Sequence, residues 1–235
     1  MALSPDSDAR PPLPNKVDFY FDPMCPWAYQ TSLWIRAVAS LTGLEVIWKF
    51  FSLEEINRVE GKKHPWEREW SYGWGQMRVA ALLRRDGNDL VDRWYAAVGR
   101  AFHELGVKTH DQAIHREILT EAGLPADALD RAIADPTTSD DVKADHDAVV
   151  ATHGAFGVPT LVFDDGNHIY GPVTVPAPQG DEALALWELT VAAARVPTLY
   201  ELKRPKTQKD LAAIGRAFTP YIDARDWNTV ENPAP

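Results

Sequence analysis

Residues that favour β-strands are confined to two short blocks, which a long stretch of helical periodicity separates. The first block spans residues 17–21 and 44–51, and the second spans 159–163 and 168–170. Strands are stable only when they pair, so the two blocks are expected to join in one sheet although residues 52–154 lie between them. The chain is therefore limited to an α/β fold that carries a large all-helical insertion.

The first block predicts a crossover unit. Between its two strands, apolar residues recur at helical spacing over residues 26–41, with Gly43 just past the end. A strand, a helix and a strand in this order form a right-handed parallel unit. We also expect four or five helices between residues 52 and 152, a hairpin with its turn at 164–167, and a last long helix over 180–194.

The charge of the chain argues against nucleic acid and membrane surfaces as partners. Its 235 residues include 24 Lys and Arg against 34 Asp and Glu, and the net charge of −10 repels phosphate backbones and anionic lipid. No apolar run is long enough to span a bilayer, and the first residues lack the basic start and apolar stretch of a secretory signal. We therefore expect a cytoplasmic protein with no nucleic-acid partner and no membrane partner.

The chain has a single cysteine, Cys25, so it contains no intramolecular disulfide. Cys25 stands where the first predicted strand ends and the helix that Pro26 opens begins. Free N–H groups and the positive end of the helix dipole favour a thiolate here and lower its pKa, and the thiolate is the nucleophilic form. The alternative is a small buried hydrophobe. We favour a catalytic Cys25, because a Cys-Pro pair at the head of a helix is an uncommon use of a core residue.

A proline at the start of a returning strand is the second feature that suggests a site. Pro159 follows Gly157 and Val158 at the beginning of the predicted strand 159–163. Most X-Pro bonds are trans, so an ordinary trans proline at the start of a strand is the alternative. Together with Cys25, the pattern predicts a cis bond between Val158 and Pro159.

Tryptophans recur every four positions at Trp66, Trp70 and Trp74, which would place three indoles along one face of a helix. Such a stripe either packs into the core or forms a flat wall for an aromatic substrate, and the sequence leaves both open. Arg78, one turn further, is a weaker candidate for substrate binding. The seven histidines lack the spacing of a zinc site, and the glycines around Trp74 do not follow a strand. We therefore expect no metal, nucleotide or flavin.

Six short motifs, three of which contain residues discussed above, are distributed along the chain. They are Phe19-Tyr20-Phe21-Asp22-Pro23-Met24-Cys25-Pro26-Trp27-Ala28, Trp74-Gly75-Gln76-Met77-Arg78-Val79-Ala80, Ala122-Gly123-Leu124-Pro125, Gly157-Val158-Pro159-Thr160, Tyr170-Gly171-Pro172-Val173 and Tyr200-Glu201-Leu202-Lys203-Arg204. Over residues 16–206 the chain resembles the DsbA-like proteins of thioredoxin fold, and most of all the branch of the mycothiol-dependent nitroreductases and FrnE-like proteins. We accordingly expect a disordered tail at 1–15, a thioredoxin-like domain at 16–51 and 155–198, the helical insertion at 52–154, and a C-terminal extension at 199–235.

The resemblance implies a role for each residue around Cys25. The cysteine at this position attacks disulfides or adducts of low-molecular-weight thiols, and Pro26, Trp27, Val158 and Pro159 bind the substrate beside it. The loop that contains Pro159 lies against the cysteine. The backbone of Val158 then binds a sulfur-bearing ligand as an added strand.

The resemblance also implies the co-substrate and the substrates. Mycothiol or a similar small thiol serves as co-substrate, and no cofactor is tightly bound. The molecules reduced are small aromatic compounds of the nitroaromatic or quinone type, or mixed disulfides. The helix with Trp74 and Arg78 forms part of a lid over the cysteine, so both side chains are expected to bind substrate.

The chain departs from the resembled family at one position. The family pattern is Cys-Pro-Trp-Cys, whereas Ala28 stands at the last position and has no sulfur to resolve a mixed disulfide. A dithiol oxidase cycle is therefore excluded. A monothiol cycle remains, in which a second thiol or a separate redoxin releases the mixed disulfide on Cys25. Two alternatives stay open: a non-redox enzyme similar to the kappa-class glutathione transferases and their isomerase relatives, and a redox-inactive protein that binds small molecules.

Overall fold

The sheet at the centre of the molecule joins the two predicted blocks of strands. The computed structural model describes residues 11–68, 71–109 and 111–224, and within them a four-stranded sheet has the order β2-β1-β3-β4. Its strands are β1 (Lys16–Phe21), β2 (Glu45–Phe50), β3 (Thr160–Phe163) and β4 (His168–Tyr170). β1 runs parallel to β2 and antiparallel to β3, and β3 forms the predicted hairpin with β4. The contact between β1 and β3 therefore brings the two ends of the fold together.

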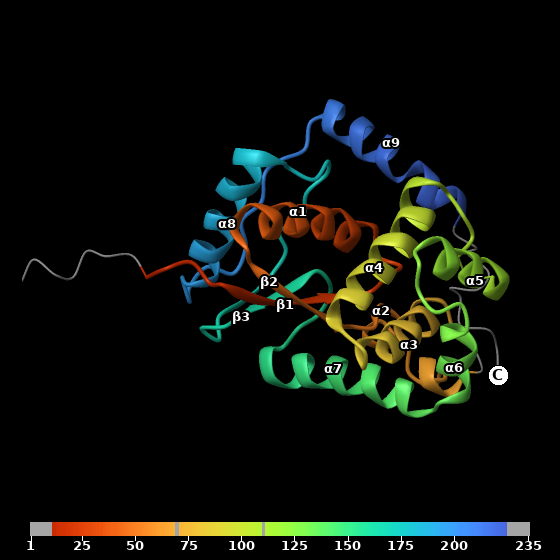
Figure 1. Cartoon of the computed structure of the whole chain (residues 1–235). Helices are drawn as coiled ribbons and strands as arrows, with labels where there is room; N and C mark the ends of the chain where they lie inside the picture. The colour runs from red at the N-terminus through yellow and green to blue at the C-terminus, as the bar shows by residue number, and fades with distance from the viewer. Residues whose placement is uncertain (1–10, 69–70, 110, 225–235) are drawn as a thin grey trace, which may run out of the picture.

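Helices cover both faces of the sheet (Figure 1). α1 (Pro26–Thr42) and α8 (Gly180–Ala194) pack side by side on one face, and α7 (Thr137–His153) lies on the other. α1 ends at Gly43, whose φ of 75° is the left-handed conformation that glycine adopts most easily. The bounds of α1 and α8 confirm the helices that the sequence predicted over 26–41 and 180–194.

The chain between β2 and β3 is helical, as predicted, but it has six α-helices in its described part rather than four or five. With two further helical turns, the order is α2 (Leu53–Ile56), the 3-10 turn η1 (Pro65–Glu67), α3 (Tyr72–Arg84), α4 (Asn88–Gly99), the π-helical turn η2 (Arg100–Glu104), α5 (Gln112–Glu121), α6 (Ala128–Ala134) and α7. α2 is a single turn, which is too short to give a periodic signal in the sequence. Among the helices described, none has the length and hydropathy needed to cross a membrane.

Aromatic side chains join the insertion to the sheet. Phe21 of β1 stacks on Tyr95 of α4 with ring centroids 4.0 Å apart, and Trp48 of β2 packs edge-on against the same tyrosine at 5.4 Å. The guanidinium carbon of Arg36, from α1, lies 4.5 Å from the centre of the Trp48 ring. The three rings are buried, so the sheet, α1 and α4 share one core.

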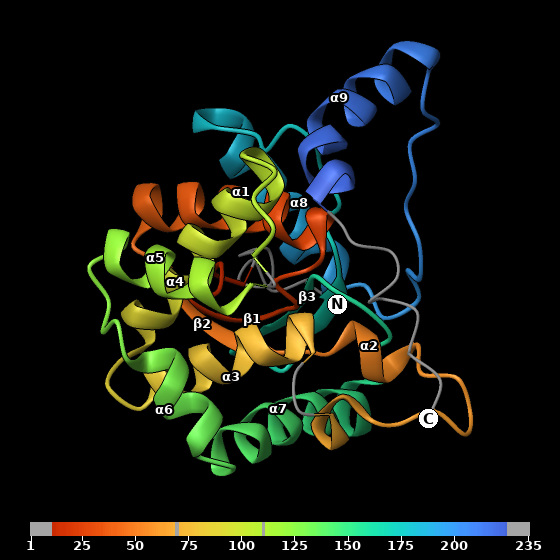
Figure 2. The same ribbon diagram turned by 90° about the vertical axis from the view of Figure 1, so that its right-hand side faces the viewer.

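The C-terminal part of the chain forms a further helix that the sequence did not predict. After α8, the exposed segment 196–207 leads to α9 (Gln208–Ala224), which stands apart from the sheet (Figure 2). At the other terminus, Arg195 donates hydrogen bonds to the carbonyl oxygens of Pro11 and Pro12 at 3.2 and 2.8 Å, so this part of the predicted tail contacts the body. The expected disorder of residues 1–10 and the end of the expected extension, 225–235, lie outside the described residues.

Candidate active site

The turn between β1 and α1 is fixed by Asp22, whose carboxylate is buried. The backbone carbonyl of Asp22 accepts a hydrogen bond from the Cys25 N–H at 3.0 Å, and its Oδ1 accepts one from the Met24 N–H at 2.9 Å. Its Oδ2 accepts from the Leu53 N–H at 2.8 Å, which ties the turn to α2. Gly73 of α3 leaves room for this carboxylate, because a Cβ there would lie 2.7 Å from Oδ1. The hydrogen bonds of Asp22 therefore fix the backbone of the turn that leads to Cys25.

Cys25 caps the N-terminus of α1 with its sulfur. The Ala28 N–H donates to Sγ at 3.4 Å, and Pro26 occupies the first turn of the helix, as predicted. The thiol in turn donates to the Val158 carbonyl oxygen, 3.8 Å from Sγ. The sulfur thus lies between the start of α1 and the loop before β3, which are the two segments that the sequence motifs paired.

The loop before β3 contains the predicted cis proline. The Val158–Pro159 bond is cis, and the Pro159 carbonyl accepts a hydrogen bond from the Gly171 N–H at 2.8 Å. Two further cis bonds, Gly171–Pro172 and Val175–Pro176, follow β4 and were not predicted. The Thr31 hydroxyl of α1 donates to the Pro172 carbonyl at 2.8 Å, so the segment after β4 is also tied to α1.

The expected fall in the Cys25 pKa is wrong for this conformation. Burial raises the pKa of the thiol to about 11, and the negative charge of Asp22 adds to the rise. The N–H groups of Ala28 and Trp27 at the helix start lower the pKa, as expected from a helix N-terminus, but the loss of solvent outweighs them because Cys25 is only 7% exposed. In this conformation Cys25 is a thiol rather than a thiolate.

Asp22 is a functional candidate that the sequence interpretation treated only as part of a turn. Burial raises its pKa to about 7, against the opposing effect of the hydrogen bonds from Leu53 and Met24. The charge of Glu54 adds to the rise. The signal that could have identified Asp22 is its position three residues before Cys25, where the end of a central strand leaves little access to water.

The π-helical turn η2 braces the other side of the same loop. His103 donates from Nε2 to the Pro23 carbonyl at 2.8 Å, and its ring stacks on Tyr29 at 4.9 Å. The Tyr29 hydroxyl donates to Glu104 at 2.6 Å. Burial lowers the pKa of His103 to about 4, so the imidazole is neutral and its Nε2 carries the proton. Nothing in the sequence placed this turn beside Cys25, because a π-helical turn has no periodic signature of its own.

Trp27 lies beside the cysteine, as the motif predicts. It is half-buried and packs against the apolar cluster that contains Cys25 and Val158. One side of its ring is covered by Phe218 of α9, with centroids 4.6 Å apart and the planes at 84°. The structure therefore brings together five of the predicted site residues, namely Cys25, Pro26, Trp27, Val158 and Pro159.

The predicted stripe of tryptophans does not lie on one helix. Trp66 belongs to the turn η1, and α3 begins only at Tyr72, because the extended backbone of Arg68 interrupts the helical path. Trp66 and Trp74 still meet, with ring centroids 5.3 Å apart. The Trp74 indole donates to the Ser139 hydroxyl of α7 at 2.8 Å and is buried in the main core. Its contacts are those of core packing. The third predicted member, Trp70, lies outside the described residues.

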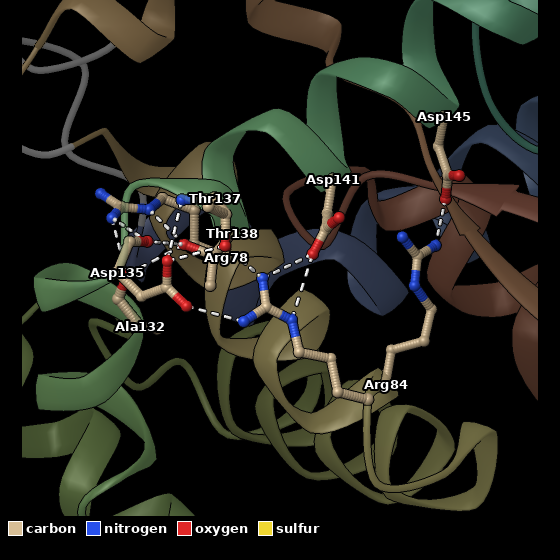
Figure 3. Close-up of polar contacts among 9 residues, drawn as sticks. Arg78, Arg84, Ala132, Asp135, Thr137, Thr138, Asp141 and Asp145 are labelled. Atoms are coloured by element: carbon tan, nitrogen blue, oxygen red, sulfur yellow. Dashed lines mark hydrogen bonds and ion pairs between the residues drawn. The ribbon is translucent and has the colours of Figure 1, made fainter.

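Arg78 joins helices of the insertion (Figure 3). Its guanidinium donates to the carbonyl oxygens of Ala132, Ile133 and Asp135 at 2.6, 3.1 and 3.3 Å, and to the Thr138 hydroxyl at 3.0 Å. Free carbonyls at a helix C-terminus need donors, and Arg78 supplies them at the end of α6. The Arg78 side chain thus connects the end of α6 to the start of α7, and these hydrogen bonds do not direct it toward Cys25.

No metal centre is formed by the residues that the structure describes. Among residues 11–68, 71–109 and 111–224, no group of three or more His, Cys, Asp and Glu side chains is arranged to hold a metal ion. The groups that the structure places around the Cys25 sulfur are the Ala28 N–H, the Val158 carbonyl and the buried Asp22.

Several known proteins are similar to this chain in sequence or in fold. The chain is 55% identical over 214 residues to the protein named Uncharacterized protein Rv2286c of Mycobacterium tuberculosis, which covers 91% of this chain and 92% of that protein. It is 23% identical over 175 residues to a 2-hydroxychromene-2-carboxylate isomerase of Sphingobium xenophagum, covering 63% of this chain and 89% of the isomerase. The solved structure of the cytosolic disulfide reductase DsbM from Pseudomonas aeruginosa matches with a TM-score of 0.53 at 18% identity, over 75% of this chain and 98% of that one. The fold is thioredoxin-like with a helical insertion.

One family, described as Mycothiol-dependent nitroreductase Rv2466c, matches residues 24–204. The matched span begins beside Cys25, includes the helical insertion and the cis Pro159, and ends before α9. It covers well over half of the chain. The chain therefore belongs to the Rv2466c-like family of mycothiol-dependent nitroreductases.

Proposed function

We propose that this protein is a thiol-dependent oxidoreductase in which Cys25 is the sulfur nucleophile and a small thiol of the mycothiol type is the co-substrate. The observation that carries the proposal is the position of Sγ between the Ala28 N–H and the Val158 carbonyl. The N–H group can stabilise a thiolate, and the Val158 backbone lies where an extended ligand could pair with it. Membership of the mycothiol-dependent family supports the choice of thiol.

Because Ala28 has no sulfur, the cycle needs two external thiols. The Cys25 thiolate adds to an electron-poor acceptor, for which a quinone serves as the example. A first thiol, RSH, attacks the Cys25 sulfur, so that the acceptor leaves with the bonding electron pair and takes up protons, and Cys25 keeps a disulfide to R. A second RSH attacks this mixed disulfide and releases RSSR and free Cys25. The sum, quinone + 2 RSH → hydroquinone + RSSR, balances in atoms and electrons. A redoxin that replaces the second thiol is a variant of the same cycle.

The acceptor that fits this site is a small aromatic molecule of the nitroaromatic or quinone type. Trp27 offers an indole surface in the same apolar cluster as Cys25, and flat rings pack well on such a surface. Pro26, Val158 and Pro159 complete the surroundings of the sulfur on the helix side and on the loop side. A reduced pool of small thiol is needed to drive the cycle, so we place the protein in the cytoplasm.

The thiol must lose its proton before it attacks. With a pKa of about 11, Cys25 is almost wholly protonated at neutral pH. Burial is the main cause of the rise, so access of solvent to Sγ lowers the pKa toward the value that a helix N-terminus favours. The reactive form therefore belongs to a conformation in which Cys25 is more exposed than it is here.

A non-redox isomerase is the second candidate, favoured by Ala28 and by the similarity to 2-hydroxychromene-2-carboxylate isomerase. In such an enzyme Cys25 would bind or polarise the substrate, and no thiol would be consumed. The two functions differ in stoichiometry, because only the oxidoreductase forms one RSSR for every two electrons that the acceptor takes up. A protein that merely binds small molecules would give neither RSSR nor a covalent adduct.

Turnover with reduced mycothiol and a nitroaromatic acceptor tests the proposal. We expect mycothiol disulfide to accumulate in step with loss of the nitro compound, at a rate about ten-fold or more above that of the Cys25→Ser variant. Equal rates for the two proteins would contradict a role for the cysteine. Conversion of an isomerase substrate without any mycothiol disulfide would favour the second candidate.

A further inference from the structure

The helix that covers Trp27 lies outside the part of the chain that matches the family. The matched residues end at 204, whereas α9 begins at Gln208. Phe218 of α9 is nonetheless buried, and its ring meets the Trp27 ring edge-on with centroids 4.6 Å apart. A helix beyond the family boundary thus occupies aromatic surface next to Cys25.

α9 also contacts His103, which binds the backbone on the N-terminal side of Cys25. Tyr221 stacks on His103 with ring centroids 5.4 Å apart and the planes at 29°. The same His103 donates to the Pro23 carbonyl, two residues before Cys25. Trp27 lies two residues after it. The C-terminal turns of α9 therefore hold both flanks of the cysteine, one through Phe218 and the other through Tyr221.

The rest of α9 has much less contact with the body. No residue of 208–217 is buried, and Leu211, a large apolar side chain of this part of the helix, is 47% exposed. The connecting segment 196–207 is exposed along its whole length, and Tyr200 within it is 92% exposed. Figure 2 shows this segment as a long extended connection between α8 and α9. The attachment is therefore concentrated at the end of α9 that faces Cys25, and the connection is long enough for that end to move away.

We propose that α9 is an autoinhibitory strap, in which Phe218 holds the place on Trp27 that the aromatic ring of the acceptor takes. The assignment of the acceptor ring rests on the proposed function, whereas the strap itself does not. Another aromatic ring can reproduce an edge-to-face contact with an indole, so an acceptor can replace Phe218 without loss of that contact. Trp27 packs against the cluster that holds Cys25, so we expect release of Phe218 to loosen this packing and to increase the access of solvent to the sulfur.

The first experiment compares Phe218→Ala with Leu211→Ala, a matched control on the exposed part of the same helix. The rate at which Cys25 is modified is measured with N-ethylmaleimide and with N-phenylmaleimide, which differ only in an ethyl or a phenyl group. We expect Phe218→Ala to raise the rate with N-phenylmaleimide about ten-fold or more, and the rate with N-ethylmaleimide by a smaller factor, because the phenyl ring also fills the vacated place. Leu211→Ala should stay within about two-fold of the unchanged protein.

Two results of this comparison would overturn the proposal. Rates that Phe218→Ala leaves unchanged for both reagents would show that α9 does not control access. An equal rise for both reagents would show that the vacated surface has no preference for an aromatic ring.

The second experiment locks the strap with a disulfide in the variant Gly106→Cys/Pro220→Cys. A Cβ built at Gly106 lies 3.7 Å from the Cβ of Pro220, a usual separation for a disulfide, and 3.3 Å from the Pro220 carbonyl oxygen. A cysteine at the φ of 65° of Gly106 therefore carries some strain, and closure needs a small backbone shift. With this bond closed, modification of the peptide that contains Cys25 should slow about ten-fold or more and recover when the bond is reduced. The same rate in both states would overturn the strap. Because the readout is modification rather than turnover, a failed thiol cycle would leave these rates unaffected, which separates the two proposals.

Discussion

The Cys25 thiol donates to the carbonyl oxygen of Val158, a residue 133 positions further along the chain, across 3.8 Å. The sulfur also accepts from the Ala28 N–H, so one atom links the start of α1 to the loop with the cis proline. The contact with Val158 needs the two blocks of strands to pair through β1 and β3, whereas the contact with Ala28 is local to the start of α1. A substitution at Cys25 can therefore change both the stability of the α1 N-terminus and the reactivity of the site.

Two substitutions at Cys25 should separate its structural role from its chemical one. Serine is a better N-cap than cysteine, so we expect Cys25→Ser to be at least as stable as the unchanged protein. Cys25→Ala leaves the Ala28 N–H without this acceptor and should cost about 1 kcal/mol of unfolding free energy. Urea unfolding measures the difference, and equal stability of the two variants would contradict the capping role. Neither variant should be modified by disulfides.

Asp22→Asn should lower the pKa of Cys25. The Asp22 carboxyl, with a pKa of about 7, is largely ionised in mildly alkaline solution, and its charge then raises the pKa of the thiol. Removal of this charge should move the midpoint of the pH profile for Cys25 alkylation to lower pH. Asp164→Asn, which removes a charge from the exposed turn between β3 and β4, is the control. A midpoint that both variants share with the unchanged protein would contradict the coupling.

Much of the site could be predicted from local patterns. The strand over 17–21 and Pro26 in the first helical turn each follow from a short run of residues, and the cis bond before Pro159 follows from this motif together with Cys25. The structure confirms all three. The pKa of Cys25 could not be predicted in this way. It depends on how deeply the sulfur is buried by segments far away in the chain, including the loop at Val158.

Other contacts that the sequence did not indicate have the same physical origin. The spacing of Trp66 and Trp74 is compatible with one helix, but the interruption at Arg68 separates them, and only the tertiary packing brings their rings together. Arg78 is a candidate for substrate binding through the resemblance alone, and its partners at the end of α6, more than fifty positions away, could not be read from the sequence. The contact between Trp27 and Phe218 likewise joins distant parts of the chain, so no local pattern indicates it.

The pH dependence of the unfolding free energy should show that His103 is buried in its neutral form. Its pKa is about 4 in the folded protein and 6.5 in the reference state, so the folded protein favours the neutral ring. The stability from this neutral ring is fully present above pH 6.5 and is lost as the pH falls toward 4, by on the order of 3 kcal/mol. His103→Gln keeps a donor for the Pro23 carbonyl but does not titrate, so its unfolding free energy should fall less over this range. Parallel curves for the two proteins would contradict the burial of an uncharged histidine.

Arg78→Lys should affect stability rather than chemistry. A lysine cannot donate to four acceptors at once, so carbonyls at the end of α6 lose their partners at a cost of about 1–3 kcal/mol. The rate of Cys25 alkylation in the folded variant should be unchanged. Unchanged stability together with a loss of turnover would instead restore Arg78 to the substrate site.

The mass of the intact protein after incubation with mycothiol disulfide tests the reactive cysteine most directly. The account predicts one mycothiol bound per chain, on Cys25, with none on Cys25→Ser and complete release by reduced mycothiol. A folded protein that stays unmodified, under conditions in which the urea-unfolded chain is modified at Cys25, would contradict it.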